Sequence, residues 1–306
     1  MLDRRRFLGW SAASLGLLPW PGVFALEAGQ PSRTARGAAM QRAAHQLLEK
    51  PPVFEDPIAL RIFGDEGTAW LDRNLERYRS ERSRAMRAFL VMRSRYAEDR
   101  LADAVARGVR QYVVLGAGLD TFACRNPHRG LRVFEVDHPL TQAWKRDRLR
   151  AQAIAVPESA IFAPVDFERQ ALAEGLAAAG FRADQPAFFS WLGVVIYLSR
   201  DAVAGTLRTV AACARGSEVV FDFSPPPDEL DSAERSRHVA LASRVAGIGE
   251  PWLSYYAPAA LAAELQALGF SAPQHLGSAE MNDRYFHDRA DGFRLYGSGR
   301  MMTAQV

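Results

Sequence analysis

Short apolar runs alternate along this chain with longer segments in which apolar and polar positions mix. The apolar runs are of the β type and are expected to form strands at 111–115, 131–136, 161–165, 186–191 and 218–223. Helices are expected after them, near 139–155, 168–180, 200–214 and 258–268. Strands that are apolar along their whole length and are separated by helices are typical of a parallel sheet covered on both faces. The pattern therefore predicts an α/β fold.

A helix-rich region precedes this alternation. Residues 34–49 are expected to form a helix, which Pro51 and Pro52 would end. Further helices are expected from about 57 to 107, with apolar positions such as Met86, Leu90 and Leu101 on one side.

Two further features follow the fifth strand. The segment from about 225 to 254 begins with three prolines and is interpreted as an insertion that could cover a substrate. The tail then adds two strand-like runs separated by a polar connection, at 272–277 and 292–298.

The first expected strand ends in a glycine turn, and the second ends in an acid. Gly116-Ala117-Gly118 allows the backbone to bend and a ligand to approach it closely. Asp137 follows the glycine turn at the ~20-residue spacing that nucleoside-binding β–α–β units show. There the carboxylate accepts hydrogen bonds from the ribose hydroxyls. The pair predicts a nucleoside site, with glycines that serve packing alone as the alternative.

The residues after the second glycine indicate which nucleoside is bound. A dinucleotide site has a third glycine three positions later, so that a helix N-terminus can close on a pyrophosphate. Here Thr121 and Phe122 stand near that position, and the carboxylate of Asp120 would repel a phosphate. An acidic turn suits a cation, because a nearby carboxylate favours positive charge. The sequence therefore favours the sulfonium nucleoside S-adenosyl-L-methionine over NAD.

Several motifs together resemble a known family. They are LGAGLDTFACR at 115–125, FEVDHPLTQAWKRD at 134–147, Val165-Asp166-Phe167, FSWLGVVIYL at 189–198, the blocks 32–48 and 52–57, Gly249-Glu250-Pro251 and Leu268-Gly269-Phe270. The chain is similar to the leucine carboxyl methyltransferase-like family of class I S-adenosylmethionine-dependent methyltransferases, in particular to its bacterial branch. The likeness covers about residue 32 to the C-terminus.

This resemblance implies a Rossmann-like class I methyltransferase fold. Its seven-stranded, mostly parallel sheet has helices on both faces and carries an N-terminal helical extension. Residues 31–306 would form a single domain. Within it, residues 31–110 would be the helical cap, and residues 111–306 would be the cofactor-binding core.

The resemblance also implies a set of cofactor-binding residues. Gly116, Ala117 and Gly118 would pass beneath the methionine portion of the cofactor, and Asp137 would hold its ribose. Arg93 would pair with the cofactor's carboxylate, with Arg95 as the weaker candidate.

The adenine end has its own implied contacts. Asp166 would accept the adenine amino group, and the backbone N–H of Phe167 would meet a ring nitrogen. The chain departs from some members of the family at Leu192, where those members carry a glutamate. Any role of that acid in holding the cofactor is absent here or is taken over by another residue.

Length and composition fit a soluble protein of one large domain. The chain has 306 residues, of which 48% are hydrophobic and 24% charged. Its net charge of +3 does not indicate a nucleic-acid partner. The arginines between 73 and 110, other than Arg93, are interpreted mostly as a solvated helix face. Two cysteines and six histidines show no metal-ligand spacing, so no metal site is expected.

The first thirty residues resemble an export signal. Asp3-Arg4-Arg5-Arg6-Phe7-Leu8 matches the core of a twin-arginine signal, and small residues near Ala25 suit cleavage. The apolar stretch between them is too short and too interrupted to span a membrane. Residues 1–30 are therefore expected to direct export to the periplasm. A cytoplasmic location is the alternative, because the cofactor is made and recycled there.

The sequence constrains the methyl acceptor less than the cofactor. A carboxylate acceptor is an anion near neutral pH and needs no base, whereas a hydroxyl acceptor needs one. The weak candidates for substrate contacts are Arg42, His45 and Tyr197, for each of which packing or solvation is the alternative role. No compelling base is found, and the catalytic residues stay unassigned.

The expected activity is O-methylation of a small-molecule carboxyl or already acidic hydroxyl group. Two other functions remain open. The chain could be a non-catalytic, exported cofactor-binding protein of methyltransferase fold, or an NAD-dependent oxidoreductase.

Overall fold

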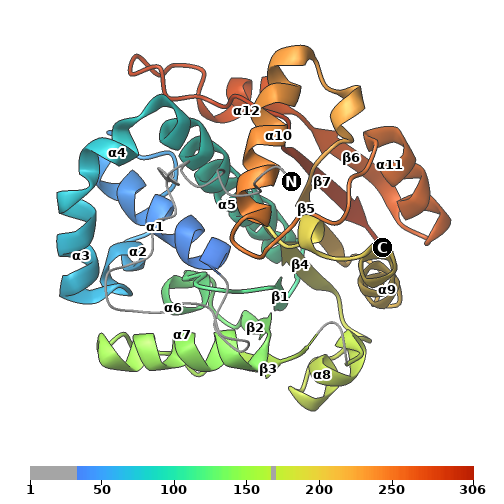
Figure 1. The fold of residues 1–306 in the computed structure, drawn as a ribbon. Coiled ribbons are helices and arrows are strands. Elements are labelled where there is room, and N and C mark those ends of the chain that lie inside the picture. Colours follow the sequence, from blue (N-terminus) through green and yellow to red (C-terminus); the bar gives the residue numbers. More distant parts are fainter. Residues whose placement is uncertain (1–32, 167–169) are drawn as a thin grey trace, which may run out of the picture.

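The computed structural model describes residues 33–166 and 170–306, and its centre is a seven-stranded sheet (Figure 1). The strand order is β3-β2-β1-β4-β5-β7-β6, in which β7 runs antiparallel to both of its neighbours. The strands are β1 (Gln111–Leu115), β2 (Arg132–Asp137), β3 (Ala160–Pro164), β4 (Ala187–Trp191), β5 (Glu218–Phe223), β6 (Ser271–Leu276) and β7 (Arg300–Gln305). The expected seven-stranded, mostly parallel, Rossmann-like methyltransferase sheet is confirmed.

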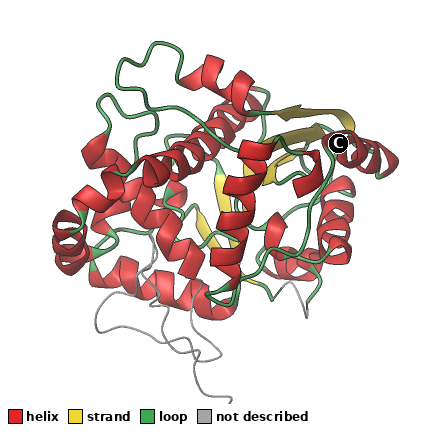
Figure 2. Cartoon of the chain, turned by 45° about the horizontal axis from the view of Figure 1, so that its top comes forward, coloured by secondary structure: helices red, strands yellow, loops and turns green. Residues whose placement is uncertain are grey.

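Helices surround this sheet, as Figure 2 shows. They are α1 (Arg33–Leu48), α2 (Ile58–Arg61), α3 (Gly64–Arg73), α4 (Leu75–Arg79), α5 (Glu81–Ala106), α6 (Phe122–Arg125), α7 (Pro139–Ala151), α8 (Leu172–Ala178), α9 (Arg200–Ala211), α10 (Ser232–Ala246), α11 (Pro258–Ala267) and α12 (Ser278–Tyr285). The described residues also include the short 3-10 helices η1 (Val195–Tyr197) and η2 (Pro227–Glu229). None of the described helices is long and apolar enough to cross a bilayer.

Both faces of the sheet are buried, which explains why its strands are apolar along their whole length. Successive side chains of a strand point to opposite faces. Val113 and Phe189 pack on one face against α8, α9 and α11, whereas Tyr112 and Phe188 pack on the other face against α5. Because the helices cover both faces, a ligand can reach the sheet only where its strands end. In open α/β sheets, ligands usually bind at the carboxyl ends of the strands.

The N-terminal helical extension lies over those carboxyl ends. Helices α1, α2 and α3 form a third apolar cluster with α7. In α1, Ala35 lies so close to the glycine turn that a Cβ built on Gly118 would be 3.2 Å from the Cβ of Ala35. The extension therefore forms one wall of the site.

Ion pairs with buried carboxylates engage some arginines of this extension, which corrects the interpretation of those arginines as a solvated helix face, whereas Arg73, Arg95 and Arg110 are exposed as expected. Arg87 of α5 is fully buried and binds Glu49 through two contacts of 2.9 and 2.6 Å. Arg100 and Arg107 both reach the buried carboxylate of Glu218 on β5, at 2.7 and 2.6 Å. These arginines were misinterpreted because their partners lie far away in the sequence.

The tail differs from the sequence prediction. The last strand is Arg300–Gln305, not 292–298, and the connection before it contains α12. Residues 292–298 are irregular, although Phe293 and Leu295 are buried in the cluster on the α5 face of the sheet. The insertion expected at 225–254 contains η2 and α10. The leader expected at residues 1–30 lies outside the described residues.

Candidate functional site

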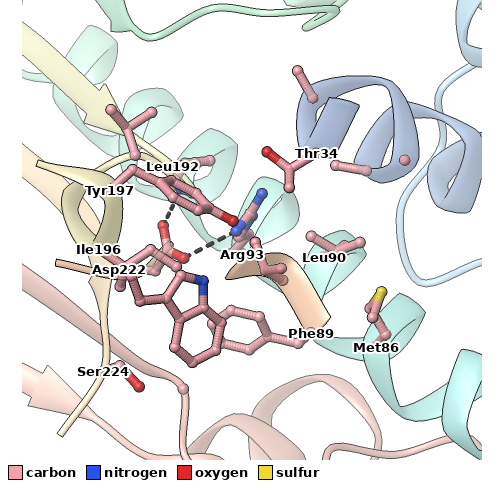
Figure 3. Close-up of a pocket in the computed structure, with 18 of the residues that line it drawn as sticks. Thr34, Met86, Phe89, Leu90, Arg93, Leu192, Ile196, Tyr197, Asp222 and Ser224 are labelled. Atoms are coloured by element: carbon pink, nitrogen blue, oxygen red, sulfur yellow. Dashed lines mark hydrogen bonds and ion pairs between the residues drawn. The ribbon is translucent and has the colours of Figure 1, made fainter. Parts of the chain in front are cut away.

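A cavity of about 1450 Å³ opens at the carboxyl ends of the parallel strands (Figure 3). It lies where the strand order reverses between β1 and β4, which is the usual ligand position in an open α/β sheet. Residues of α1, α5 and α10 line it as well. Sites for one drug-sized ligand measure roughly 300–1,000 Å³. This cavity therefore has room for two small molecules side by side.

The glycine turn forms the floor of the cavity beside β1. Gly116 and Gly118 have φ values of +67° and +48°, in the left-handed region that other residues rarely adopt. A Cβ on Gly116 would also lie only 2.3 Å from Cγ2 of Val194. The backbone N–H groups of Gly116 and Ala117 both donate to the carbonyl of Val136, at 2.8 and 3.0 Å. Glycine is therefore required at position 116 by both conformation and space.

Asp137 lies directly beside this turn. Its carboxylate accepts hydrogen bonds from the backbone N–H groups of Gly118 and His138. Burial raises the pKa of Asp137, and the two backbone hydrogen bonds oppose that rise. The structure thus brings together the turn and the acid that the sequence pairs, and both line the cavity.

The expected adenine contacts are described only in part. Asp166 lines the same cavity beyond β3, and its Oδ2 lies 3.9 Å from Nε2 of His138. Phe167 lies outside the described residues. The side of the cavity that was expected to hold the nucleoside is formed by segments that follow β1, β2 and β3.

Arg93 reaches the cavity from α5 and pairs with an acid that the sequence did not single out. Its Nη1 lies 2.9 Å from Oδ2 of Asp222 on β5, while the backbone N–H of Gly193 donates to Oδ1 of the same carboxylate (Figure 3). Leu192, the position at which the family resemblance implied a departure, also lines the cavity. Asp222 thus places a carboxylate next to this position from the neighbouring strand. Arg95 is 48% exposed and pairs with Asp99, away from the cavity.

The three weak candidates for substrate contacts differ in their positions. Arg42 lines the cavity but donates to the carbonyl of Leu119 and lies 3.5 Å from Asp56. Tyr197 also lines the cavity, and burial raises the pKa of its hydroxyl.

The structure does not bring His45 into the cavity with the other two candidates. Its ring is fully buried, Nδ1 bonds Glu49 at 3.0 Å, and Nε2 accepts from the N–H of Val53 at 2.9 Å. With both ring nitrogens engaged, His45 is a structural residue.

The side of the cavity near β5 is mainly apolar. Met86, Phe89 and Leu90 extend into it from α5, opposite Ile196 and Tyr197 of η1 (Figure 3). The apolar positions of α5 that the sequence assigned to one helix side thus divide between two roles. Leu101 is buried in the core, whereas Met86 and Leu90 face the cavity.

A histidine that the sequence did not single out also lines this side. His238 of α10 is buried, and burial lowers the pKa of its imidazole. Its Nδ1 lies 2.9 Å from Oγ of Ser298 and 3.4 Å from Oγ of Ser224. The signal that could have identified it is its place in the insertion expected to cover a substrate. Within the described ranges, no cluster of His, Cys, Asp or Glu could hold a metal ion.

Comparisons with known proteins agree with this geometry. Residues 35–211 match the family model described as leucine carboxyl methyltransferase. The chain is 28% identical over 288 residues to "Putative S-adenosyl-L-methionine-dependent methyltransferase YktD" of Bacillus subtilis (strain 168), covering 87% of this chain and 94% of that protein. It is 31% identical over 224 residues to a Mycobacterium avium (strain 104) protein named "Putative S-adenosyl-L-methionine-dependent methyltransferase", covering 70% and 72%.

Among solved structures, the fold is similar to that of a protein of Thermobifida fusca YX described as a putative methyltransferase. The TM-score is 0.55 at 16% identity, with 91% of this chain and 96% of that chain covered. At this identity the likeness concerns the fold alone.

Proposed function

The chain belongs to the leucine carboxyl methyltransferase family, and we propose that it transfers the methyl group of S-adenosyl-L-methionine to a carboxyl or hydroxyl oxygen of a small molecule. Dependence on S-adenosyl-L-methionine follows from the family and from the names of the relatives. The identity of the acceptor atom is not given by the family or the relatives, and it is our own proposal. One observation supports the proposal above all: the glycine turn and Asp137 meet at one end of a cavity that has room for a second molecule.

The cofactor's nucleoside would occupy the end of the cavity near β1, β2 and β3. Asp137 already receives one hydrogen bond at each oxygen, and a carboxylate can accept about four, so it can also accept ribose hydroxyls. Asp166 would accept the adenine amino group, and the N–H of Phe167 would meet the ring. The glycine turn leaves room for the backbone to pass close beneath the methionine portion.

Arg93 would bind the carboxylate of the methionine portion. Its guanidinium keeps further N–H donors beyond the contact of Nη1 with Asp222, because arginine carries five. Asp222 holds that guanidinium in place and adds a negative charge beside the site of a cationic sulfur. We infer that Asp222 takes over the cofactor-holding role of the glutamate that the family resemblance implies at the position of Leu192.

The protein's contribution to the reaction is mainly positioning. When bound, the cofactor supplies a methyl group already activated on a sulfonium. The walls must hold the acceptor oxygen in line at about 3–3.5 Å, a geometry that can account for much of the acceleration. The apolar side chains of α5 and η1 keep water away from that point.

Titration calorimetry of the full-length chain with S-adenosyl-L-methionine tests the cofactor site. We expect micromolar affinity, and we expect Asp137→Ala to abolish detectable binding because the ribose loses its acceptor. Affinity should fall as the pH is lowered, and at a higher pH than for an ordinary aspartate, because burial raises the pKa of Asp137 and protonation removes the acceptor. Unchanged binding by Asp137→Ala would contradict this assignment.

Incubation with tritiated cofactor and a lysate of the native host tests the transfer itself. A labelled small molecule that is cleaved by mild base is the expected product for a carboxyl acceptor. A base-stable labelled ether is the expected product for a hydroxyl acceptor. Tight cofactor binding with no labelled product would instead favour a non-catalytic binding protein.

A further inference from the structure

His238 has a buried ring nitrogen that no described residue contacts through a hydrogen bond. The residue is 4% exposed and lines the cavity, and its Nδ1 bonds Oγ of Ser298 at 2.9 Å. Its Nε2 has no partner among the residues that the structure describes. A buried polar atom left unpaired costs free energy, so it requires an explanation such as a ligand or a catalytic role.

The position of His238 separates it from the nucleoside end of the cavity. Ser224, one of its neighbours, directly follows β5, and Ser298 precedes β7. In the sheet order, β4 lies between β5 and the strands whose ends form the nucleoside side. The part of the cavity beyond the proposed nucleoside site therefore lies towards the end of β5, which is where His238 is found.

The insertion holds the histidine ring in place. Trp252 lies edge-on to it with ring centroids 5.1 Å apart, and Tyr255 lies 5.5 Å away. The edge-to-face contact with Trp252 favours one ring orientation, and the Tyr255 ring is tilted against the imidazole. Together with the Ser298 contact, they fix both the position and the plane of the imidazole.

The same side of the cavity suits a flat apolar molecule better than an anion. Phe89, Tyr197 and Trp252 line it with aromatic rings, which pack well against planar ligands. Arg93, the cation at its base, is paired with Asp222, and its remaining donors are assigned to the cofactor's own carboxylate. The other arginines that line this side, Arg82 and Arg237, are exposed. A buried carboxylate acceptor would therefore find no uncommitted buried cation among these residues.

We propose that the methyl acceptor is the hydroxyl group of an apolar aromatic compound, and that Nε2 of His238 takes the proton from that hydroxyl. This inference rests on the proposed function and narrows its acceptor from carboxyl or hydroxyl to a phenolic hydroxyl. A phenol ionises near pH 10, as the tyrosine side chain does, and its proton is therefore within reach of a histidine base.

In this step the imidazole keeps its own proton on Nδ1, and that N–H donates a hydrogen bond to Oγ of Ser298. The lone pair of the ring is therefore on Nε2. As the acceptor oxygen forms its bond to the methyl carbon, the bond from that carbon to sulfur breaks and its electron pair stays on sulfur. The hydroxyl proton passes to Nε2. The sulfonium charge is thereby replaced by an imidazolium charge, and the imidazolium returns its proton to water. Burial lowers the pKa of His238, which keeps the ring neutral before the step and favours this proton release.

The wild-type protein tests the acceptor class directly. The full-length chain is saturated with S-adenosylhomocysteine and titrated with 2-naphthol or with 2-naphthoate, which share one ring system. We expect 2-naphthol to bind at least tenfold more tightly. With tritiated cofactor, 2-naphthol should yield 2-methoxynaphthalene. Equal or tighter binding of 2-naphthoate, no binding of 2-naphthol, or bound 2-naphthol that is not methylated would each overturn the proposal.

Two variants test the role of Nε2 rather than the presence of the ring. His238→Asn retains a polar group near Nδ1 that can contact Ser298 but removes Nε2, whereas His238→Gln places an amide near Nε2. We expect His238→Asn to slow methylation of 2-naphthol at least a hundredfold and to leave S-adenosylhomocysteine affinity within twofold. His238→Gln should keep 2-naphthol binding within threefold and still transfer slowly, because an amide is not a base. Wild-type rates in His238→Asn would overturn the proposal.

The order of measurements separates two failures. If the wild-type chain does not bind S-adenosylhomocysteine, the proposed function fails, and this inference fails with it. If it binds S-adenosylhomocysteine but the naphthol results are negative, only the inference fails.

Discussion

Gly193 shows how the conformation of one residue controls a charged contact in the site. Its φ of +72° lies in the left-handed region, and a Cβ there would be 2.6 Å from Nη2 of Arg93. Its N–H also holds Asp222, the partner of that arginine. A side chain at this position would therefore displace the guanidinium that we assign to the cofactor's carboxylate.

Gly193→Ala is accordingly expected to weaken S-adenosyl-L-methionine binding at least tenfold in titration calorimetry. It should also lower the free energy of unfolding by about 1–2 kcal/mol, the cost of a left-handed alanine. Gly292→Ala is the matched control, because Gly292 has a φ of +67° with no atom within 4 Å of an added Cβ. The control should lose similar stability and keep full affinity. Equal affinities in the two variants would contradict the role given to Arg93.

A second prediction at the residue scale concerns the buried pair of Arg87 and Glu49. Burial raises the pKa of Glu49, but hydrogen bonds from His45 and Arg87 lower it by more, so the net pKa is lowered. Removing one partner of a buried pair typically costs 3–5 kcal/mol, because the other charge is left uncompensated. We expect a loss of about that size for Arg87→Met in urea unfolding. Arg95→Met, which breaks an exposed pair, should change stability by less than about 1 kcal/mol.

The acid dependence of stability gives a check on the same pair. A carboxylate with a lowered folded-state pKa contributes stability that is complete above its unfolded-state pKa and is lost as the pH falls through the folded-state pKa. Wild-type stability should therefore decline on acidification below the ordinary glutamate range. Glu49→Gln should lack this part of the decline, and an identical acid profile would show that the pair does not contribute.

These residues also show where sequence reasoning reaches its limit. The meeting of the glycine turn with Asp137 could be predicted, because a local spacing in the sequence indicates it. Arg87 could not, since arginine is rarely buried and its partner lies 38 positions away. Asp222 and His238 share this difficulty, because their roles arise from contacts with Arg93 and Ser298 on other elements.

At the scale of elements, the insertion and the N-terminal helix are joined across the cavity. The carboxylate of Glu250 accepts from the backbone N–H groups of Arg33 and Thr34 and from the hydroxyl of Thr34. These N–H groups belong to the first described turn of α1, and backbone donors in a first turn need acceptors from outside the helix. A carboxylate from another segment thus caps α1, and it also matches the positive end of the helix dipole.

Replacement of this cap should loosen a wall of the site. Glu250→Gln is expected to cost about 0.5–2 kcal/mol of stability, as losses of N-caps do. Hydrogen exchange should increase in the first turn of α1 and leave β1 unchanged. Glu264→Gln, which removes an exposed pair with Arg200, is the control and should change neither measurement. Protection of α1 that stays at the wild-type level would contradict a capping role.

The last strand shows why some elements could not be predicted. Arg300–Gln305 lies between β5 and β6 and has a buried centre, yet that centre holds two methionines and an alanine, and Thr303 is its one β-branched residue. Residues 292–298 contain Phe293, Leu295 and Tyr296 and therefore look more like a strand. Strand propensity mostly reflects packing against neighbouring strands. Pairing with β5 and β6 decides the outcome here, and a local pattern does not contain that information.

At the scale of the whole molecule, the cavity depends on segments from the entire chain. The core supplies the strand ends, the N-terminal extension supplies α1 and α5, and the insertion supplies α10 (Figure 1). A ligand that fills the cavity contacts all three parts. Its binding should therefore stabilise the whole fold, and it should do so only if its chemistry matches the glycine turn.

The turn itself discriminates between the two nucleoside cofactors. Oδ1 of Asp120 accepts from the N–H of Phe122 at 2.8 Å, so a carboxylate occupies the start of α6 where a pyrophosphate would bind. Helix α6 is also only four residues long. We expect S-adenosylhomocysteine at a hundredfold excess over its Kd to stabilise the chain by about 2.7 kcal/mol. In thermal unfolding this would raise Tm by a few degrees, whereas NAD at the same concentration should leave Tm unchanged. A rise of Tm with NAD and none with S-adenosylhomocysteine would restore the oxidoreductase hypothesis. It would mean that a pyrophosphate displaces the Asp120 carboxylate from the start of α6.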